Sequence, residues 1–513
     1  MKVLLSLLCF VLFSTRGETL TVRKDGVSQF VVTEYGAIGN GENLCTRAIQ
    51  KAIDECELNG GGRVYVPPGR YLTGSLILKS GVGLYLERNS VLYGSGDLSS
   101  YPAGVLISAR NAENVSIEGR GEINGNGRRF WKSDSLPLKR PHGLIRFEDC
   151  RNVVLKGVKL HNSPKFTLYL ENCSLVQIDE IEIENTLDSP NTDGIDVTNS
   201  SNVFISKSFI MTGDDGICLK SNRLDRNVEN VVVSNCIIIS DDTALKLGTG
   251  SKNTISDCIF TNIVIPEATN GVGLFMNDGG VFERLQFSNI NMVTRVAPQK
   301  RYFPADGGAE YWRKVLEKRE SFPIFIDSDS RTGEGPAGVI QDVTFRDIVM
   351  DVKDGNCLIS GRKDRHLENI TMDGIRMDVI SERDFRGRKK PRGSHEMKGT
   401  GLQDFASVPS FFTFAYVDGL TLRGISIRRF QPRGVVPMNC IFAKGVSRAR
   451  MSGVDISETE KDTLAVVKLV ESRDILLTDS PLPGTRTALV EVDTGTSRHK
   501  VIEGDPFGNV RVK

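Results

Sequence analysis

The feature that most constrains the fold of this chain is a repeat of short strands in its central third. Each strand spans four residues and follows the preceding copy after roughly 22 to 28 residues. A second set of strands lies between these copies and commonly begins after an asparagine, as at Asn152, Asn202 and Asn230. The first set comprises Leu144–Phe147, Thr167–Leu170, Gly194–Val197, Gly216–Leu219, Ala244–Leu247 and Gly271–Leu274.

A period of this length with several strands per period is typical of a parallel β-helix, in which each coil buries its apolar side against the next. Leucine-rich repeats share the period, but their leucine and asparagine consensus and their repeated helices are missing. A propeller blade would need about 40–45 residues. We therefore expect an all-β fold built as a single-stranded parallel β-helix.

The two ends of the repeat are marked differently in the sequence. Apolar residues recur at helical spacing from Leu44 to Cys56, and Gly60–Gly62 ends the pattern, so we expect a helix that caps the N-terminal end. Residues from about 295 to 335 interrupt the strand pattern and carry Tyr302, Phe303, Tyr311 and Trp312, which indicates an insertion. We find no linker, so residues 18–513 are predicted to form one domain.

Composition and the N-terminus limit the cellular setting. Residues 1–17 combine Lys2 with an apolar run and small residues, a pattern typical of a signal peptide, so we expect a secreted or periplasmic protein. No other stretch is apolar enough to cross a membrane. A net charge of +1 argues against nucleic-acid binding, and the cysteines form no CxxC pair that would indicate zinc.

Three acidic residues directly precede two neighbouring strands of the repeat. Asp193 ends the segment Asn191–Asp193, and Asp214 with Asp215 follows Gly213. Stacking the strands places Asp193 and Asp215 at equivalent positions of adjacent coils, about 4.8 Å apart. Because like charges this close cannot all ionise comfortably, one pKa should rise, as in paired acid/base catalysis. Acidic residues in tight turns, or a calcium site, would give the same pattern.

Together with earlier motifs, these segments resemble the polygalacturonase family of glycoside hydrolases, family 28. The resemblance rests on Asn191–Gly194 and Gly213–Asp215, on Glu34–Ala37, on Gly60–Gly69 and on Gly121–Gly127. It covers at least residues 30–295. It implies a right-handed, pectin-lyase-like β-helix and hydrolysis with inversion, in which Asp214 is the general acid while Asp193 and Asp215 hold and deprotonate water.

The chain departs from this family at two motifs. Thr243 stands where the family has a histidine, and Gly273 and Phe275 stand where it has the arginine and lysine that grip a galacturonate carboxylate. Lys220 and Lys246 are candidates to compensate, although both also fit ordinary surface lysines. A surface that pairs Lys246 with Phe275 would suit a neutral or deoxy sugar beside an acidic one, as in rhamnogalacturonan.

Two further residues fall on the same column of the repeat as Asp214. His142 and Lys165 lie two or three coils upstream of it and are candidates to line a neighbouring subsite, or are simply exposed.

The sequence thus predicts a secreted, monomeric glycosidase of polygalacturonan or rhamnogalacturonan that needs no metal or cofactor. Its partner would be an acidic plant-type polysaccharide or its oligomers. Two other functions stay open, namely a calcium-dependent pectate lyase and a non-catalytic carbohydrate-binding solenoid.

Overall fold

The protein is described by a computed structural model. It covers residues 21–22, 28–131, 139–296, 321–330, 337–353, 355–381, 405, 408–430, 438–457, 465–480, 488–501 and 510–512. Among these residues, no helix combines the length and the hydrophobicity that crossing a membrane requires.

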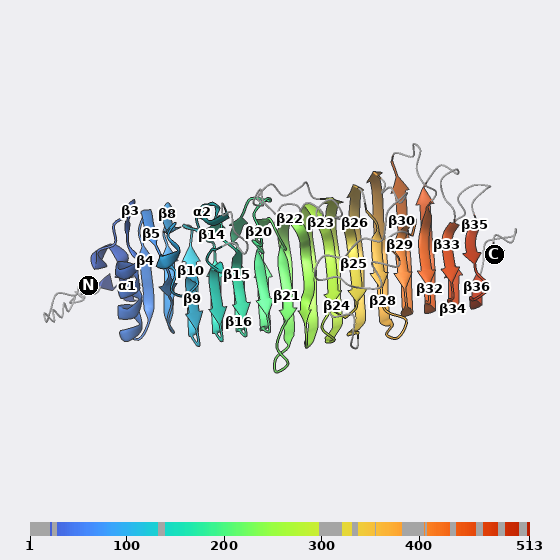
Figure 1. Cartoon of the computed structure of the whole chain (residues 1–513), viewed down its shortest axis with the longest axis horizontal. Helices are drawn as coiled ribbons and strands as arrows, with labels where there is room; N and C mark the ends of the chain where they lie inside the picture. The colour runs from blue at the N-terminus through green and yellow to red at the C-terminus, as the bar shows by residue number, and fades with distance from the viewer. Residues whose placement is uncertain are drawn as a thin grey trace, which may run out of the picture.

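The chain forms an elongated right-handed β-helix whose coils follow one another along the long axis (Figure 1). Neighbouring coils pair in parallel along three ladders, and the terminal pair of β1 with β2 is antiparallel. The predicted fold class is confirmed.

The first ladder carries the acidic residues singled out above. Its strands are β6 (Leu76–Ile77), β9 (Val105–Arg110), β12 (Gly143–Glu148), β15 (Phe166–Glu171), β18 (Ile195–Thr198), β21 (Ile217–Ser221), β25 (Phe322–Ser328), β27 (Cys357–Ser360), β29 (Ser410–Ala415), β31 (Asn439–Lys444), β33 (Ala465–Val470), β35 (Ala488–Val492) and β37 (Val510–Val512).

The second and third ladders complete each coil. The second contains β1 (Thr21–Val22), β2 (Ser28–Val31), β4 (Gly62–Val66), β7 (Val82–Leu86), β10 (Glu113–Gly119), β13 (Arg151–Lys156), β16 (Ser174–Asp179), β19 (Ser201–Ser206), β34 (Arg473–Thr478) and β36 (Ser497–Val501). The third contains β3 (Asn40–Leu44), β5 (Gly69–Thr73), β8 (Ser90–Gly94), β11 (Glu122–Asn124), β14 (Lys159–His161), β17 (Glu182–Glu184) and β20 (Phe209–Thr212).

Several long strands bend through more than one ladder. Strands β22 (Val228–Ser251) and β23 (Thr254–Met276) take part in all three ladders. The others run through the second and third ladders: β24 (Val281–Arg295), β26 (Val339–Lys353), β28 (Leu367–Ser381), β30 (Val417–Arg429) and β32 (Ser447–Ser457).

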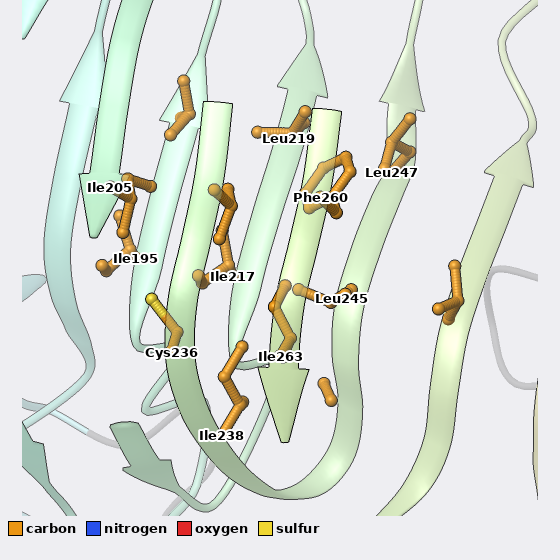
Figure 2. Packing of buried hydrophobic residues seen from close by; sticks show 14 of the residues in the cluster. Ile195, Ile205, Ile217, Leu219, Cys236, Ile238, Leu245, Leu247, Phe260 and Ile263 are labelled. Carbon is orange, nitrogen blue, oxygen red and sulfur yellow. The ribbon is translucent and has the colours of Figure 1, made fainter. Parts of the chain in front are cut away.

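Apolar side chains from all three ladders fill the interior. In the first ladder Ile195 pairs with Ile217, and Ile217 with Leu245, so equivalent residues stack coil upon coil. Figure 2 shows these side chains on neighbouring strands, with Phe260 on a facing strand. Phe260 also stacks on Phe287 at a centroid distance of 4.8 Å. Stacking at a fixed register therefore builds a continuous apolar core.

The asparagines at the beginning of the second-ladder strands have a left-handed backbone. Asn114 and Asn152 have φ of 56° and 54°, a conformation that asparagine adopts more readily than most residues. The Asn152 amide donates to Asn114 Oδ1 at 2.7 Å, and Asn289 donates to Asn262 in the same way. The asparagine pattern seen in the sequence therefore reflects turns that repeat from coil to coil.

Helix α1 (Thr46–Leu58) lies at the N-terminal end of the β-helix (Figure 1). It buries Ile49, Ala52, Ile53 and Cys56, and so covers the open end of the core as predicted. The other helices are short, namely α2 (Arg128–Trp131) and the 3₁₀ segments η1 (Val32–Tyr35) and η2 (Leu98–Ser100).

Part of the expected insertion at about 295–335 is a strand of the β-helix. Phe322–Ser328 forms strand β25, which pairs with β23 and β27 as an ordinary coil strand. The strand was missed because all its residues are buried, so that the exposure does not alternate along it. Tyr302, Phe303, Tyr311 and Trp312 lie outside the described residues, as does the predicted signal peptide.

We expect the stacked interior to control stability. Phe260 has 0% exposure whereas Phe204, on the outer surface, is 51% exposed. Phe260→Ala should cost about 3–5 kcal/mol because it leaves a cavity, and Phe204→Ala should cost within about 0.5 kcal/mol. Thermal unfolding of both variants measures this, and equal losses would contradict the assigned core.

Candidate active site

Two glycines set the spacing of the acidic residues. Asp193 precedes Gly194 at the start of β18, and Asp215 precedes Gly216 at the start of β21. A Cβ on Gly194 would lie 2.5 Å from the carbonyl oxygen of Gly216, and one on Gly216 would lie 2.5 Å from that of Ala244. Only glycine allows this close approach, which holds Asp193 and Asp215 side by side on adjacent coils.

The structure brings Asp193, Asp214 and Asp215 together as expected. One carboxylate oxygen from each lies within 4.8 Å of the others. Asp193 and Asp215 are 4% and 2% exposed, whereas Asp214 is partly exposed. The Ser240 hydroxyl donates to the Asp214 carbonyl at 2.7 Å and fixes this turn. Asp214 is therefore the member of the cluster that solvent reaches most easily.

The two candidate lysines lie against this cluster. Lys220 Nζ is 3.2 Å from Asp193 Oδ2 and 2.5 Å from Asp196 Oδ1. Lys246 Nζ is 2.8 Å from Asp215 Oδ2. Both lysines are therefore held within the acidic cluster and are not ordinary surface lysines.

Burial and neighbouring charges shift the pKa values of the Asp215 carboxyl and the Lys220 ammonium. Burial raises the pKa of Asp215 well above its usual value, and Asp214 and Asp193 add to the rise, while the Lys246 ammonium opposes it. Burial opposes the charge on Lys220, yet Asp196 and its other anionic neighbours raise the Lys220 pKa above its ordinary value. The site therefore combines a carboxyl that favours its proton with a firmly charged ammonium.

Sequence reasoning missed Asp196 as a member of the site. Asp196 is fully buried, and burial raises its pKa to about 7 despite the nearby Lys220. Its Oδ2 has no hydrogen-bond donor among the described residues. The signal was present, because Asp196 lies on strand β18, three residues after Asp193, and shares a column with Lys246. It was passed over because such a residue normally faces solvent.

Three positions that depart from the family pack together. A Cβ on Gly273 would lie 2.4 Å from the Phe275 ring, so the glycine makes room for that ring. The ring contacts Phe325 at a centroid distance of 5.0 Å, and Lys246 Nζ lies 5.2 Å above it. Phe275 is 7% exposed and Thr243 has 0% exposure, so in this conformation neither presents a surface to a substrate.

The remaining predicted residues lie on the N-terminal side of the cluster. The register aligns His142, Lys165, Thr192 and Asp214 on one column, as predicted. Lys165 is half-buried, with Nζ 4.6 Å above the Phe166 ring. His142 is exposed directly before β12, three coils from Asp214 on this column.

Arg140 is a second residue that sequence reasoning missed. Its Nη1 donates to the carbonyl oxygens of Pro164 and Pro190 at 2.8 and 2.5 Å, and its Nη2 donates to Asn191 Oδ1 at 2.7 Å. Burial lowers its pKa to about 10, while Asp214 and Asp193 act in the opposite direction. No strand pattern marks this position, because Arg140 lies in the loop before β12.

Two groups of side chains have the chemistry to bind a cation. One is the acidic cluster, and the other is His161 with Glu182 and Glu184 on β14 and β17. In the acidic cluster, lysine ammonium groups already neutralise Asp193 and Asp215, whereas Ca²⁺ takes six to eight oxygen ligands. The geometry therefore favours a proton-handling site over a calcium site.

Similarity to known proteins agrees with this geometry. The sequence profile named "Glycosyl hydrolases family 28" matches residues 56–298. Residues 56–298 therefore match the family 28 profile, and the rest of the chain lies outside this match. Asp193, Asp214, Asp215 and all their charged contacts described above lie inside this family 28 region.

Plant enzymes are among the relatives of the family 28 region. The chain is 30% identical over 297 residues to a probable polygalacturonase of Vitis vinifera, in an alignment that covers 51% of this chain and 60% of that protein. The chain is 28% identical over 289 residues to polygalacturonase-2 of Solanum lycopersicum, in an alignment that covers 53% of this chain and 62% of that protein. The chain thus spans about 60% of the length of these curated relatives.

A solved structure supports the fold over most of the chain. The family 28 exopolygalacturonase of Yersinia enterocolitica superposes with a TM-score of 0.62 at 17% identity, covering 88% of this chain and 79% of that one. At this identity the match shows the β-helix fold alone.

The raised pKa of Asp196 predicts a pH dependence of stability. Unfolded aspartate titrates near ~3.9, so between about pH 4 and 7 the folded chain binds more protons at Asp196, and stability falls as pH rises. Asp196→Asn should flatten this fall. Melting temperatures from pH 4.5 to 8 test it, with Asp225→Asn as a control because the Asp225 pKa is lowered to about 2. The same slope in wild type and Asp196→Asn would contradict the prediction.

Proposed function

We propose that this chain is a secreted glycoside hydrolase that cleaves glycosidic bonds in a pectic polysaccharide, polygalacturonan or rhamnogalacturonan. The observation that carries the proposal is the convergence of Asp193, Asp214 and Asp215 on the outer wall of a family 28 β-helix. Glycoside hydrolysis needs one carboxyl to protonate the leaving oxygen and another to act on the attacking water. Three carboxyls within 4.8 Å supply both functions.

We assign proton donation to Asp214. It is the most exposed of the three carboxyls, and the acid must reach the glycosidic oxygen of a polymer. In a set of carboxyls this close, the proton belongs to the cluster and not to one residue. The raised pKa of Asp215 keeps a proton available in the cluster at mildly acidic pH.

Asp193 and Asp215 are then the residues that hold and deprotonate water. Each accepts from a lysine, Lys220 for Asp193 and Lys246 for Asp215, and these bonds orient the carboxylates. The Lys246 ammonium opposes the rise that burial causes in the pKa of Asp215. The lysines therefore serve as positioning residues for the two carboxylates.

Inversion rests on the family resemblance. Inverting enzymes separate their carboxyl groups by about 6.5–9.5 Å and retaining enzymes by about 5–5.5 Å. The nearest oxygens of this cluster lie within 4.8 Å, so the separation alone does not favour inversion.

The proposal that the protein is secreted rests on the signal-peptide pattern of residues 1–17.

Asp214→Asn should lower the rate of hydrolysis by about 10²–10⁴-fold, since a positioned general acid contributes about that much. Release of reducing ends from polygalacturonan and from rhamnogalacturonan measures the loss, and identical melting curves exclude misfolding. Asp257→Asn, on the opposite side of the coil, is the matched control and should keep wild-type activity. Near wild-type activity of Asp214→Asn would overturn the assignment.

Proton NMR of the first products should show the anomeric configuration inverted relative to the cleaved bond. A product with retained configuration would contradict single displacement by water. Unsaturated products that absorb in the ultraviolet and disappear on chelation would indicate a lyase. Binding of the polysaccharide without any product would indicate a non-catalytic solenoid.

A further inference from the structure

The cations around the acidic cluster fall into two pairs. Lys220 and Lys246 are bonded to Asp193, Asp196 and Asp215. Arg140 and Lys165, in contrast, form no ion pair with any carboxylate of the described residues, although both interact electrostatically with Asp193. The second pair therefore carries positive charge that no carboxylate in the described part of the chain neutralises by direct contact.

Arg140 is held in place before any ligand arrives. Three of its guanidinium hydrogens donate to Pro164, Pro190 and Asn191. A guanidinium offers five N–H donors, so two remain without a described acceptor. These bonds tie the guanidinium to the loops that lead into β15 and β18, and so fix it beside the column of Lys165 and Asp214. A fork held in this way loses little entropy when it binds a planar anion.

Lys165 is the second cation that forms no ion pair with a described carboxylate. It is half-buried beside Phe166, and burial, followed by the nearby charge of Arg140, lowers its pKa. The register places Lys165 two coils from Asp214 on one column, a distance of about 10 Å. An anion between Arg140 and Lys165 would relieve the repulsion between the two cations and restore the charge that burial disfavours.

The C-terminal side of the acidic cluster is apolar. There the Phe275 ring lies against Gly273 and packs into an apolar cluster with Phe322 and Phe325. The positive charge without an ion pair among the described residues of this site therefore lies on the N-terminal side of the acidic residues.

We propose that Arg140 and Lys165 bind the carboxylate of an acidic sugar that lies on the N-terminal side of Asp193 and Asp214. This inference rests on the proposed function and names the part of the substrate that the site selects. The ligand class is a uronate residue of an oligosaccharide. Arg140 supplies a fork for the planar carboxylate, and Lys165 supplies a point charge.

Calorimetric titration of trigalacturonate, and of its methyl ester, into the Asp214→Asn protein tests the proposal without turnover. Lys165→Met in that background should weaken binding of trigalacturonate by about 10- to 100-fold, the loss expected for one charge-assisted hydrogen bond. Binding of the methyl ester should change little, because it carries no charge. Arg140→Lys should also weaken the acid selectively, since lysine keeps the charge but lacks the fork.

Lys207→Met is the matched control, because Lys207 is exposed on the far side of the coil and should leave both ligands unaffected. Equal losses for the acid and its ester, or no loss for the acid, would overturn the proposal. Lys165-dependent binding in a wild-type protein that cleaves no glycan would support the carboxylate site and refute the hydrolase. Cleavage of a neutral glycan without trigalacturonate binding would support the hydrolase and refute the carboxylate site.

Discussion

Parallel stacking of coils is the constraint on which the rest of the structure depends. Backbone hydrogen bonds hold successive coils about 4.8 Å apart, so residues at equivalent positions form columns along the molecule. Apolar columns close the core, as Ile195, Ile217 and Leu245 show (Figure 2). The same spacing forces Asp193 and Asp215 together, because the glycines that follow them let the backbones approach without a side chain between. Stability and the candidate chemistry therefore share one geometric cause.

The crowded carboxylates are stabilised by lysines on coils further along the wall. Lys220 reaches back to Asp193 and Asp196, and Lys246 reaches back to Asp215, so each coil compensates the charge of its predecessor. Such buried charges persist only when they are paired, since an isolated buried carboxylate would simply take up a proton. The raised pKa of Asp215 shows that pairing offsets burial only in part.

Much of the fold could be predicted from the sequence. The repeat of short strands gave the β-helix, and the helical spacing before Gly60 gave the cap α1. Strand β25 was missed because Phe322–Ser328 is buried on both faces, which removes the alternation by which a strand is recognised. At the site, Asp193, Asp214 and Asp215 were found because two of them precede equivalent strands. Asp196 and Arg140 were missed, since one sits at a position that is normally solvated and the other in a loop without periodicity.

The sequence by itself determined the repeat, the register and hence which residues share a column, because hydrogen bonding between identical backbones leaves the stacking little freedom. It also determined that the family's cations at Gly273 and Phe275 are absent. Only the tertiary structure decided where the remaining charges lie. Lys220 and Lys246 turn inward to the carboxylates, Phe275 folds over Gly273, and Arg140 crosses between two loops. Long side chains reach across several ångströms, so their partners depend on burial and packing that a linear pattern does not contain.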